Sequence, residues 1–300
     1  MDFSNYKFRC HYQGNLISVP KPLTNNQNET LLAYREKEKL TDRQKADWHS
    51  LENKLNESNI YKLNTTAENL LTDIVWNEKY GRETVLENKY FVKGIAVEKQ
   101  SRDLLGEIIG DVLTEDRERK SNEWVIGTRD VKHDEVIIDI KSCYDFNSFT
   151  KHLIDSKHEH YFRQLDCYMD LWGLKHSLLA YALIDTPPAL IDAEIIRLNY
   201  KEDILTIDGD VRDKHIPDVV RIVKNHIYTY EALEKYTQGS SSVYLKWFDD
   251  FKEIPKNERI HIVEHSFDKV RIEQRNECLT LCRNYMNNLK INNNINFKLK

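Results

Sequence analysis

The sequence has little of what fibrous, disordered and membrane proteins need. Its 300 residues include only 9 glycines and 6 prolines, with 40% hydrophobic and 31% charged residues, which is an ordinary globular composition. No segment approaches the roughly 18–20 continuous apolar residues that cross a bilayer, and residues 1–4 do not begin a signal peptide. We therefore expect a cytoplasmic protein with no membrane partner, in the host cytoplasm if the chain is viral.

The five cysteines give no paired framework, which fits a reducing compartment. Three histidines, His152, His158 and His160, lie near Cys143 and Cys167 in the sequence. Their spacing does not resemble a zinc pattern such as C-x-x-C with H-x-x-x-H. We therefore expect these histidines to face solvent.

The chain also lacks the basic excess of a typical nucleic-acid-binding protein. It has 44 Lys and Arg against 49 Asp and Glu, a formal net charge of −5, whereas basic side chains that neutralise phosphates supply much of the affinity for nucleic acid. DNA would need a local basic surface, for which Lys141, Lys151, Lys157 and Arg163 are candidates. Each of these could equally be a solvated surface charge.

One stretch, residues 124–141, combines apolar segments with regularly placed charges. Asp130 lies in a first apolar segment, Asp139 and Lys141 lie in a second, and the polar sequence K-H-D-E separates the two. We predict a β-hairpin that turns at residues 133–134. The hairpin would bring the two carboxylates close together.

Strand alternation determines which side chains of the second segment lie together. Residues two apart share one face of a strand, so Asp139 and Lys141 would project together while Ile138 and Ile140 face a core. Clustered carboxylates suit Mg²⁺, which proteins bind through one or two carboxylates with waters and substrate phosphates. Lys141 could orient the attacking water or offset charge on the phosphate in the transition state.

These residues resemble a known bipartite signature. Thr128-Arg129-Asp130 followed by Asp139-Ile140-Lys141 is similar to the signature of the PD-(D/E)xK nuclease superfamily, in its RecB-type and lambda-exonuclease-like branch of phage recombination exonucleases. Arg129 stands where the family usually has proline. This departure removes no metal ligand.

Two flanking motifs extend the resemblance over about residues 84–186. Upstream, Gly94 and Glu98 match the branch's G-x-x-x-E helix. Downstream, Gln164 and Tyr168 match its Q-x-x-x-Y helix. The four motifs therefore occur in the family's order.

Each motif alone has a plainer interpretation. D-x-K often occurs by chance in a solvated surface strand, Glu98 alone is an ordinary helix glutamate, and Gln164 and Tyr168 could merely share one helix face. However, V-I-I-D-I-K is typical of a central strand, where an unpaired Asp139 would be costly to bury. The four motifs together favour the nuclease interpretation.

The resemblance implies a Mg²⁺-dependent DNA nuclease, with Mn²⁺ as a substitute, that hydrolyses phosphodiester bonds. It favours an exonuclease acting on duplex DNA ends in phage-type recombination or DNA processing. Asp130 and Asp139 would hold the metal together with the backbone carbonyl of Ile140. Glu98 would complete the metal shell or hold its water, and Lys141 would position the attacking hydroxide.

The resemblance also suggests further contacts. Side chains that would bind DNA or brace the site are Gln164, Tyr168, Arg129, Lys151 and Arg163. Some RecB-type nucleases hold an iron–sulfur cluster on four cysteines. Neither the spacing of Cys278 and Cys282 nor the position of Cys10 reproduces that pattern.

Other functions stay open. The chain could be an inactive DNA-binding or assembly protein on a nuclease scaffold, or a restriction-type endonuclease. A small-molecule phosphohydrolase is disfavoured because the sequence has no Gly-rich phosphate loop. Cleavage polarity, a preference for DNA over RNA, a homo-oligomer and a single-strand-annealing partner are all left open.

We expect an α/β fold with a mixed central sheet flanked by helices, a restriction-endonuclease-like core. Residues 1–83 would form a helical extension packed on the core, residues 84–190 the nuclease core, and residues 191–300 a C-terminal α/β extension of the same domain. Thr41 and Gln44 form a capping box, which predicts two helices that meet near residue 40.

Beyond the motifs, several elements are expected from local patterns. They are strands at 176–185 and 259–265, and helices at 145–155, 189–198, 228–236 and 268–289. Residues 291–300 form a low-complexity tail that we expect to fray.

Overall fold

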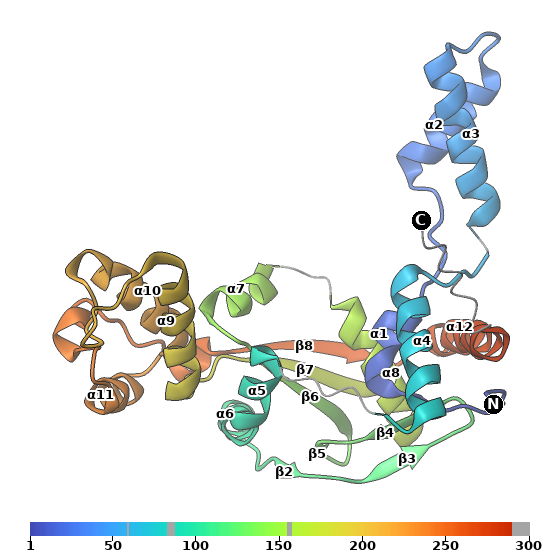
Figure 1. Cartoon of the computed structure of the whole chain (residues 1–300). Helices are drawn as coiled ribbons and strands as arrows, with labels where there is room; N and C mark the ends of the chain where they lie inside the picture. Colours follow the sequence, from blue (N-terminus) through green and yellow to red (C-terminus); the bar gives the residue numbers. More distant parts are fainter. Residues whose placement is uncertain (59, 83–87, 155–157, 290–300) are drawn as a thin grey trace, which may run out of the picture.

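A three-stranded mixed sheet lies at the centre of the molecule (Figure 1). Strand β6 (Val136–Ser142) pairs in parallel with β7 (His176–Ala182), and β7 pairs antiparallel with β8 (Ile260–Ser266). Parallel neighbours need a crossover connection, which α7 (Phe146–Ile154) and α8 (Glu159–Trp172) provide between β6 and β7. The predicted mixed sheet is confirmed.

The fold is known from a computed structural model. It describes residues 1–58, 60–82, 88–154 and 158–289. The low-complexity tail and Lys157 lie outside the described residues.

A second, smaller sheet lies beside the first. It consists of β1 (Phe8–Arg9), β4 (Val125–Thr128) and β3 (Arg119–Ser121), with β4 in the middle, parallel to β1 and antiparallel to β3. Two further short strands, β2 (Thr114–Glu115) and β5 (Val131–Lys132), pair with each other.

The predicted hairpin between the segments of Asp130 and Asp139 is wrong. Strand β4 pairs with β1 and β3, whereas β6 pairs with β7. Between them, Val131 of β5 is buried in one cluster with Leu113, next to β2. This long-range contact directs the chain away from a local turn.

Helices cover both faces of the central sheet, and others project from it (Figure 1). Those not yet given are α1 (Gln13–Leu16), α2 (Asn25–Glu36), α3 (Asp42–Glu57), α4 (Thr65–Tyr80), α5 (Lys89–Ala96), α6 (Glu98–Ile109), α9 (Pro188–Glu202), α10 (Ile216–His226), α11 (Tyr230–Gly239) and α12 (Lys269–Asn288), with short 3₁₀ helices η1 (Cys10–Tyr12), η2 (Asp213–His215), η3 (Leu245–Phe248) and η4 (Lys256–Glu258). Among the described residues, no helix is both long and apolar enough to cross a membrane.

Alternation along β6 divides the core into two layers. Ile137 is buried with Leu165 of α8 on one face of the sheet. Ile138 is buried with Leu105 of α6 on the other face. Because successive strand residues point to opposite faces, the apolar run of β6 places helices on both sides. The predicted α/β fold is confirmed.

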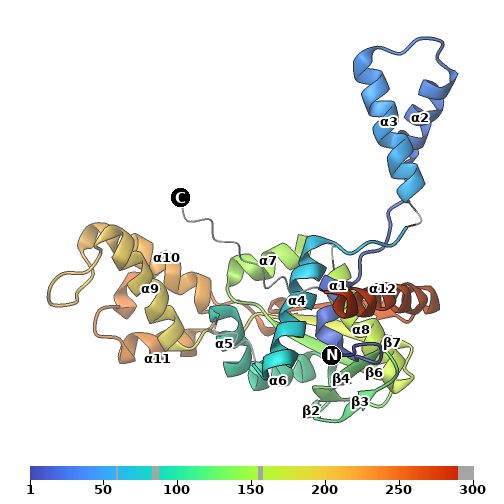
Figure 2. The same ribbon diagram turned by 45° about the vertical axis from the view of Figure 1, so that its right-hand side comes forward.

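Two parts project from this core (Figures 1 and 2). Helices α2 and α3 form a hairpin at one end, and both begin with a capping box, at Thr24 with Gln27 and at Thr41 with Gln44. At the other end, α9, α10 and α11 form a lobe, which lies between β7 and β8 in the sequence and has its own buried hydrophobic cluster.

The proposed division at residues 83 and 190 remains a prediction. Residues before 84 are not only helical, because β1 pairs with β4. The central sheet also includes β8, which follows the lobe in the sequence. Long α12 then packs against α4 and α8.

Candidate active site

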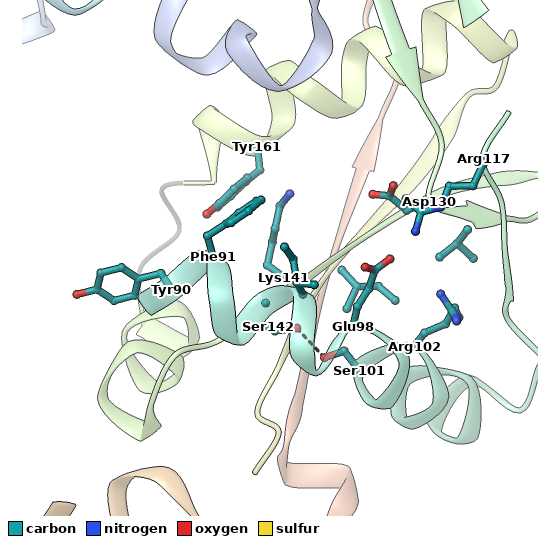
Figure 3. A pocket seen from close by; sticks show the side chains of 14 residues that line it. Tyr90, Phe91, Glu98, Ser101, Arg102, Arg117, Asp130, Lys141, Ser142 and Tyr161 are labelled. Atoms are coloured by element: carbon teal, nitrogen blue, oxygen red, sulfur yellow. Dashed lines mark hydrogen bonds between the residues drawn. The ribbon is translucent and has the colours of Figure 1, made fainter. Parts of the chain in front are cut away.

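A cavity of about 490 Å³ opens between α5, α6, the bend after β4, and β6 (Figure 3). We call it the main cavity. The residues that line it are Tyr90, Phe91, Gly94, Ile95, Glu98, Ser101, Arg102, Arg117, Asp130, Val131, Ile140, Lys141, Ser142 and Tyr161. Figure 3 shows the carboxylates of Glu98 and Asp130 and the ammonium of Lys141 pointing into the same space.

Asp139 and Lys141 lie side by side on β6, as strand alternation predicts. Lys141 Nζ donates a hydrogen bond to Asp139 Oδ1 at 3.1 Å and lies 2.9 Å from Oδ2. The Asp139 side chain is only 3% exposed, and its Oδ2 accepts no hydrogen bond from the described residues. Burial alone would lower the pKa of Lys141, but the Asp139 carboxylate raises it above its ordinary value.

Asp130 follows β4 in the bend before β5. Restricted access of solvent in the cleft, and then the charge of Asp139, raise the pKa of Asp130 to about 6. Glu98 raises it further, while Lys141 and Arg117 oppose the shift. The expected proximity of the two aspartates therefore exists, although β4 and β6 belong to different sheets.

Glu98 is the first residue of α6, so the G-x-x-x-E motif spans two short helices rather than one. Helix α5 ends at Ala96 and the chain bends at Val97, whose φ of −115° and ψ of 11° are not helical. Val97 is buried against the sheet residues of its cluster. The bend places Glu98 at the start of a helix, on the cavity side, while Gly94 lines the same cavity from α5.

Gln164 and Tyr168 brace Asp139 from α8. Gln164 Nε2 donates to Asp139 Oδ1 at 3.5 Å and to Tyr168 Oη at 3.2 Å. Gly127 of β4 allows this close packing, because a Cβ at that position would come within 2.7 Å of both the Tyr168 ring and Cys10 Sγ. Both α8 residues are buried, and they reach a second cavity rather than open surface.

The second cavity, of about 440 Å³, shares Asp130 with the main cavity. Its basic lining residues are Arg9 of β1 and Arg119 of β3, with His11 beside them. The two cavities together make a cleft with Asp130 at their common wall.

Solved structures include chains with a similar fold. A phage-related exonuclease from Haemophilus somnus 129PT matches with a TM-score of 0.58 and 20% sequence identity, over 94% of each chain. The chain shares its fold with this exonuclease. No protein-family model and no curated protein matches the chain.

Two more distant matches involve an alkaline exonuclease (LHK-Exo) from Laribacter hongkongensis. It matches with a TM-score of 0.46 and 11% identity over 76% of this chain and 82% of that one. Its complex with dAMP gives 0.45 and 11% over 75% and 81%. At these TM-scores the two structures give no basis for comparing sites. At the level of fold, the H. somnus match agrees with the resemblance seen in the sequence motifs.

Three other predicted side chains lie outside both cavities. Arg129 is buried, donates to Asp116 Oδ2 from Nε at 2.7 Å and lies over the Trp172 ring at 5.5 Å. Arg163 is buried and paired with Glu159. Neither guanidinium is therefore free to meet a DNA phosphate in this arrangement, whereas Lys151 on α7 is exposed.

Sequence reasoning missed several residues of the cleft. Tyr161 stands three positions before Gln164 on α8, a spacing that places both on one helix face, and this signal could have found it. Arg117 could not be found from a motif, because it comes from the connection between β2 and β3. Its Nη2 is held by Glu115 at 2.6 Å.

The expected solvent exposure of all three histidines is wrong for His158. Its ring is buried, and its Nδ1 lies 2.9 Å from Tyr181 Oη. The five cysteines are all buried and free of disulfides. Most of them belong to the main hydrophobic core.

A separate group of possible metal ligands lies in the lobe, far from the cleft residues in sequence. Glu202, His215 and Asp218 bring ligand atoms within 4.8 Å of one another. Asp218 already lies 3.2 Å from His215 Nδ1 and accepts a hydrogen bond from Arg221 at 2.9 Å. These contacts pair Asp218 with His215 and Arg221, and they do not involve Glu202.

Proposed function

We propose that the protein is a Mg²⁺-dependent DNA nuclease, an exonuclease that hydrolyses phosphodiester bonds at the ends of duplex DNA. The observation that carries the proposal is the arrangement of Asp130, Asp139 and Lys141 at one cleft. The fold shared with a phage-related exonuclease supports it, as does the order of the sequence motifs.

The donor set fits a hard divalent cation. Asp139 Oδ2 is buried and accepts no hydrogen bond from the described residues, although the Lys141 ammonium lies 2.9 Å from it. Restricted access of solvent, and then the charges of Asp139 and Glu98, raise the pKa of Asp130. Asp130, Asp139 and the carbonyl of Ile140 would hold Mg²⁺ or Mn²⁺, with Glu98 completing the shell or holding water. When bound, the cation would polarise the phosphate and lower the pKa of water.

The protein side chains would supply orientation and charge. Lys141 would hold the attacking water with its ammonium and offset charge that develops on the phosphate. Gln164, braced by Tyr168, would fix the Asp139 carboxylate through its hydrogen bond. Arg9 and Arg119 offer positive charge to the DNA backbone on the far side of Asp130.

The net charge of −5 does not oppose this function, because the acidic excess is uneven. Residues 187–258, which include the lobe, contain 14 acidic and 10 basic residues. The cleft lies outside this segment. DNA can therefore approach the cleft without meeting most of the negative excess.

A homo-oligomer or a single-strand-annealing protein would be a further partner.

The proposal is tested with matched linear and covalently closed duplex DNA in Mg²⁺. We expect the linear duplex to be degraded from its ends and the closed circle to survive, with no cleavage in excess chelator. Full activity in chelator would refute the metal requirement. Equal cutting of both substrates would indicate an endonuclease. Cleavage of neither, in Mg²⁺ or Mn²⁺, would favour an inactive DNA-binding protein.

The role of Lys141 is tested against that of Asp139. Lys141→Ala should bind metal and DNA nearly as wild type does but cleave on the order of 10²-fold more slowly, because the contact it loses forms mainly in the transition state. Asp139→Ala should also lose metal affinity. Single-turnover cleavage rates and DNA affinities in Ca²⁺ distinguish the two variants. If Lys141→Ala cleaves at the wild-type rate, Lys141 has no catalytic role.

A further inference from the structure

The ammonium of Lys141 has two partners of different character. One is the Asp139 carboxylate, 2.9 Å from Nζ. The other is the ring of Tyr161 on α8, whose centroid lies 5.0 Å from Nζ. This distance is within the range of a cation–π contact, and Tyr161 also lines the main cavity.

The carboxylate cannot be the lasting partner of Lys141 if Asp139 holds a cation. A divalent ion at Asp139 would compete with the ammonium for the same oxygens and would repel it. An aromatic face attracts an ammonium through its quadrupole and takes none of its protons. The ring would therefore keep the ammonium in place while leaving its N–H groups free for water and phosphate.

The surroundings of Tyr161 keep its ring in this position. The ring meets Tyr181 of β7 edge-on, with centroids 6.1 Å apart, and it packs against the main hydrophobic core. Figure 3 shows Lys141 between Tyr161 on one side and Asp130 on the other. The lysine side chain is still 28% exposed, so the strand alone does not fix its end.

We infer that Tyr161 is a positioning residue, whose ring holds the Lys141 ammonium toward the reacting phosphate. The inference rests on the proposed nuclease function and deepens it. Tyr161 itself touches no reacting atom. What it contributes is the face of its ring, so phenylalanine can replace it and leucine cannot.

The test compares Tyr161→Phe with Tyr161→Leu in single-turnover cleavage of linear duplex in Mg²⁺. Phenylalanine should keep the rate within about twofold of wild type, while leucine should lower it about tenfold, the scale of one partly desolvated cation–π contact. DNA affinity in Ca²⁺ should be unchanged in both. In a Lys141→Ala background, Tyr161→Leu should cause no further loss, because the group it positions is gone.

Tyr244→Leu is the matched control. The Tyr244 ring also lies beside a lysine ammonium, that of Lys246 at 5.4 Å, but it belongs to the lobe and lines neither cavity. Its variant should cleave at the wild-type rate. Equal losses in both leucine variants, an equal loss in Tyr161→Phe, or an additive loss on Lys141→Ala would each overturn the inference.

A second readout does not depend on cleavage. In protein labelled with ¹³Cε-lysine, the ε protons of Lys141 should show an upfield ring-current shift in wild type and Tyr161→Phe that disappears in Tyr161→Leu; Lys141→Arg assigns the signal. If wild type does not cleave, the proposed function fails, and this shift alone decides the placement of the ammonium. An unshifted wild-type signal would refute it.

Discussion

Metal binding at the cleft should release a proton at acidic pH. Restricted solvent access and the charge of Asp139 raise the pKa of Asp130 to about 6 in the metal-free protein. A protonated carboxyl must lose its proton before it binds a cation, so proton and metal compete. Below pH 6 the apparent metal affinity should fall about tenfold per pH unit, and at pH 8 Asp130 should contribute no pH dependence.

Titration calorimetry with Mn²⁺ measures this competition directly. In pairs of buffers with different ionisation heats at pH 5.5, we expect about 0.8 proton released per metal bound, and roughly none at pH 8. Asp130→Asn should abolish the release, together with much of the affinity. An affinity that is the same at pH 5.5 and pH 8, or proton release that persists in Asp130→Asn, would refute the reasoning.

Two further predictions concern the packing around the cleft. Burial lowers the pKa of Lys93 to about 8, so the unfolded chain binds more protons than the folded protein above that pH, and stability rises with pH through the window from about 8 to 10.5. Between pH 7 and 10.5, the free energy of unfolding of wild type should therefore rise by about 3 kcal/mol relative to that of Lys93→Met. Urea denaturation measures both proteins. A stability difference between them that does not change with pH would contradict this prediction. Gly127→Ala should lower the free energy of unfolding by about 1–3 kcal/mol because its Cβ would meet Tyr168 and Cys10. The control, Gly94→Ala, should be at least as stable as wild type, because its Cβ lies in a helix and would meet nothing within 4 Å. Equal effects of the two substitutions would show that contact with Tyr168 does not limit position 127.

Local sequence patterns predicted many of the helices because helix start signals depend on residues that are close in the sequence. The capping box of Thr41 with Gln44 marks the start of α3, and the same pattern at Thr24 and Gln27 marks the start of α2. Helix α10 was missed. Its Pro217 in the first turn is a typical start signal that the sequence offered.

Strand pairing was harder to predict because it depends on distant partners. Strand β4 takes Phe8–Arg9 as one neighbour, a two-residue strand with no alternation to identify it. The placement of the proposed site residues depended less on distant partners. Strand alternation alone predicted that Asp139 and Lys141 lie side by side. The proximity of Asp130 to Asp139 was expected from a hairpin, whereas in the structure β4 and β6 belong to different sheets.

Arg129 departs from the family pattern at a single position. The family places proline before the first aspartate, and the arginine here suggested a DNA contact or a brace. Its guanidinium links Asp116 and Glu118, at 2.6 and 3.3 Å, and lies over Trp172. These partners come from the loop before β3 and from the end of α8, so no local signal could have paired them. Arg129 therefore holds the bend that carries Asp130.

The charges in the cleft explain how an acidic protein could take up a polyanion. Asp139 pairs with the ammonium of Lys141, Glu98 and Asp130 line the main cavity with it, and Arg117 is already held by Glu115. Without metal, the cavity would therefore repel a phosphate group, whatever the charge elsewhere on the chain. In the proposed function, a divalent cation among the carboxylates would reverse this balance where the scissile phosphate would lie. We therefore expect DNA binding at the cleft to depend on bound metal rather than on the net charge of −5.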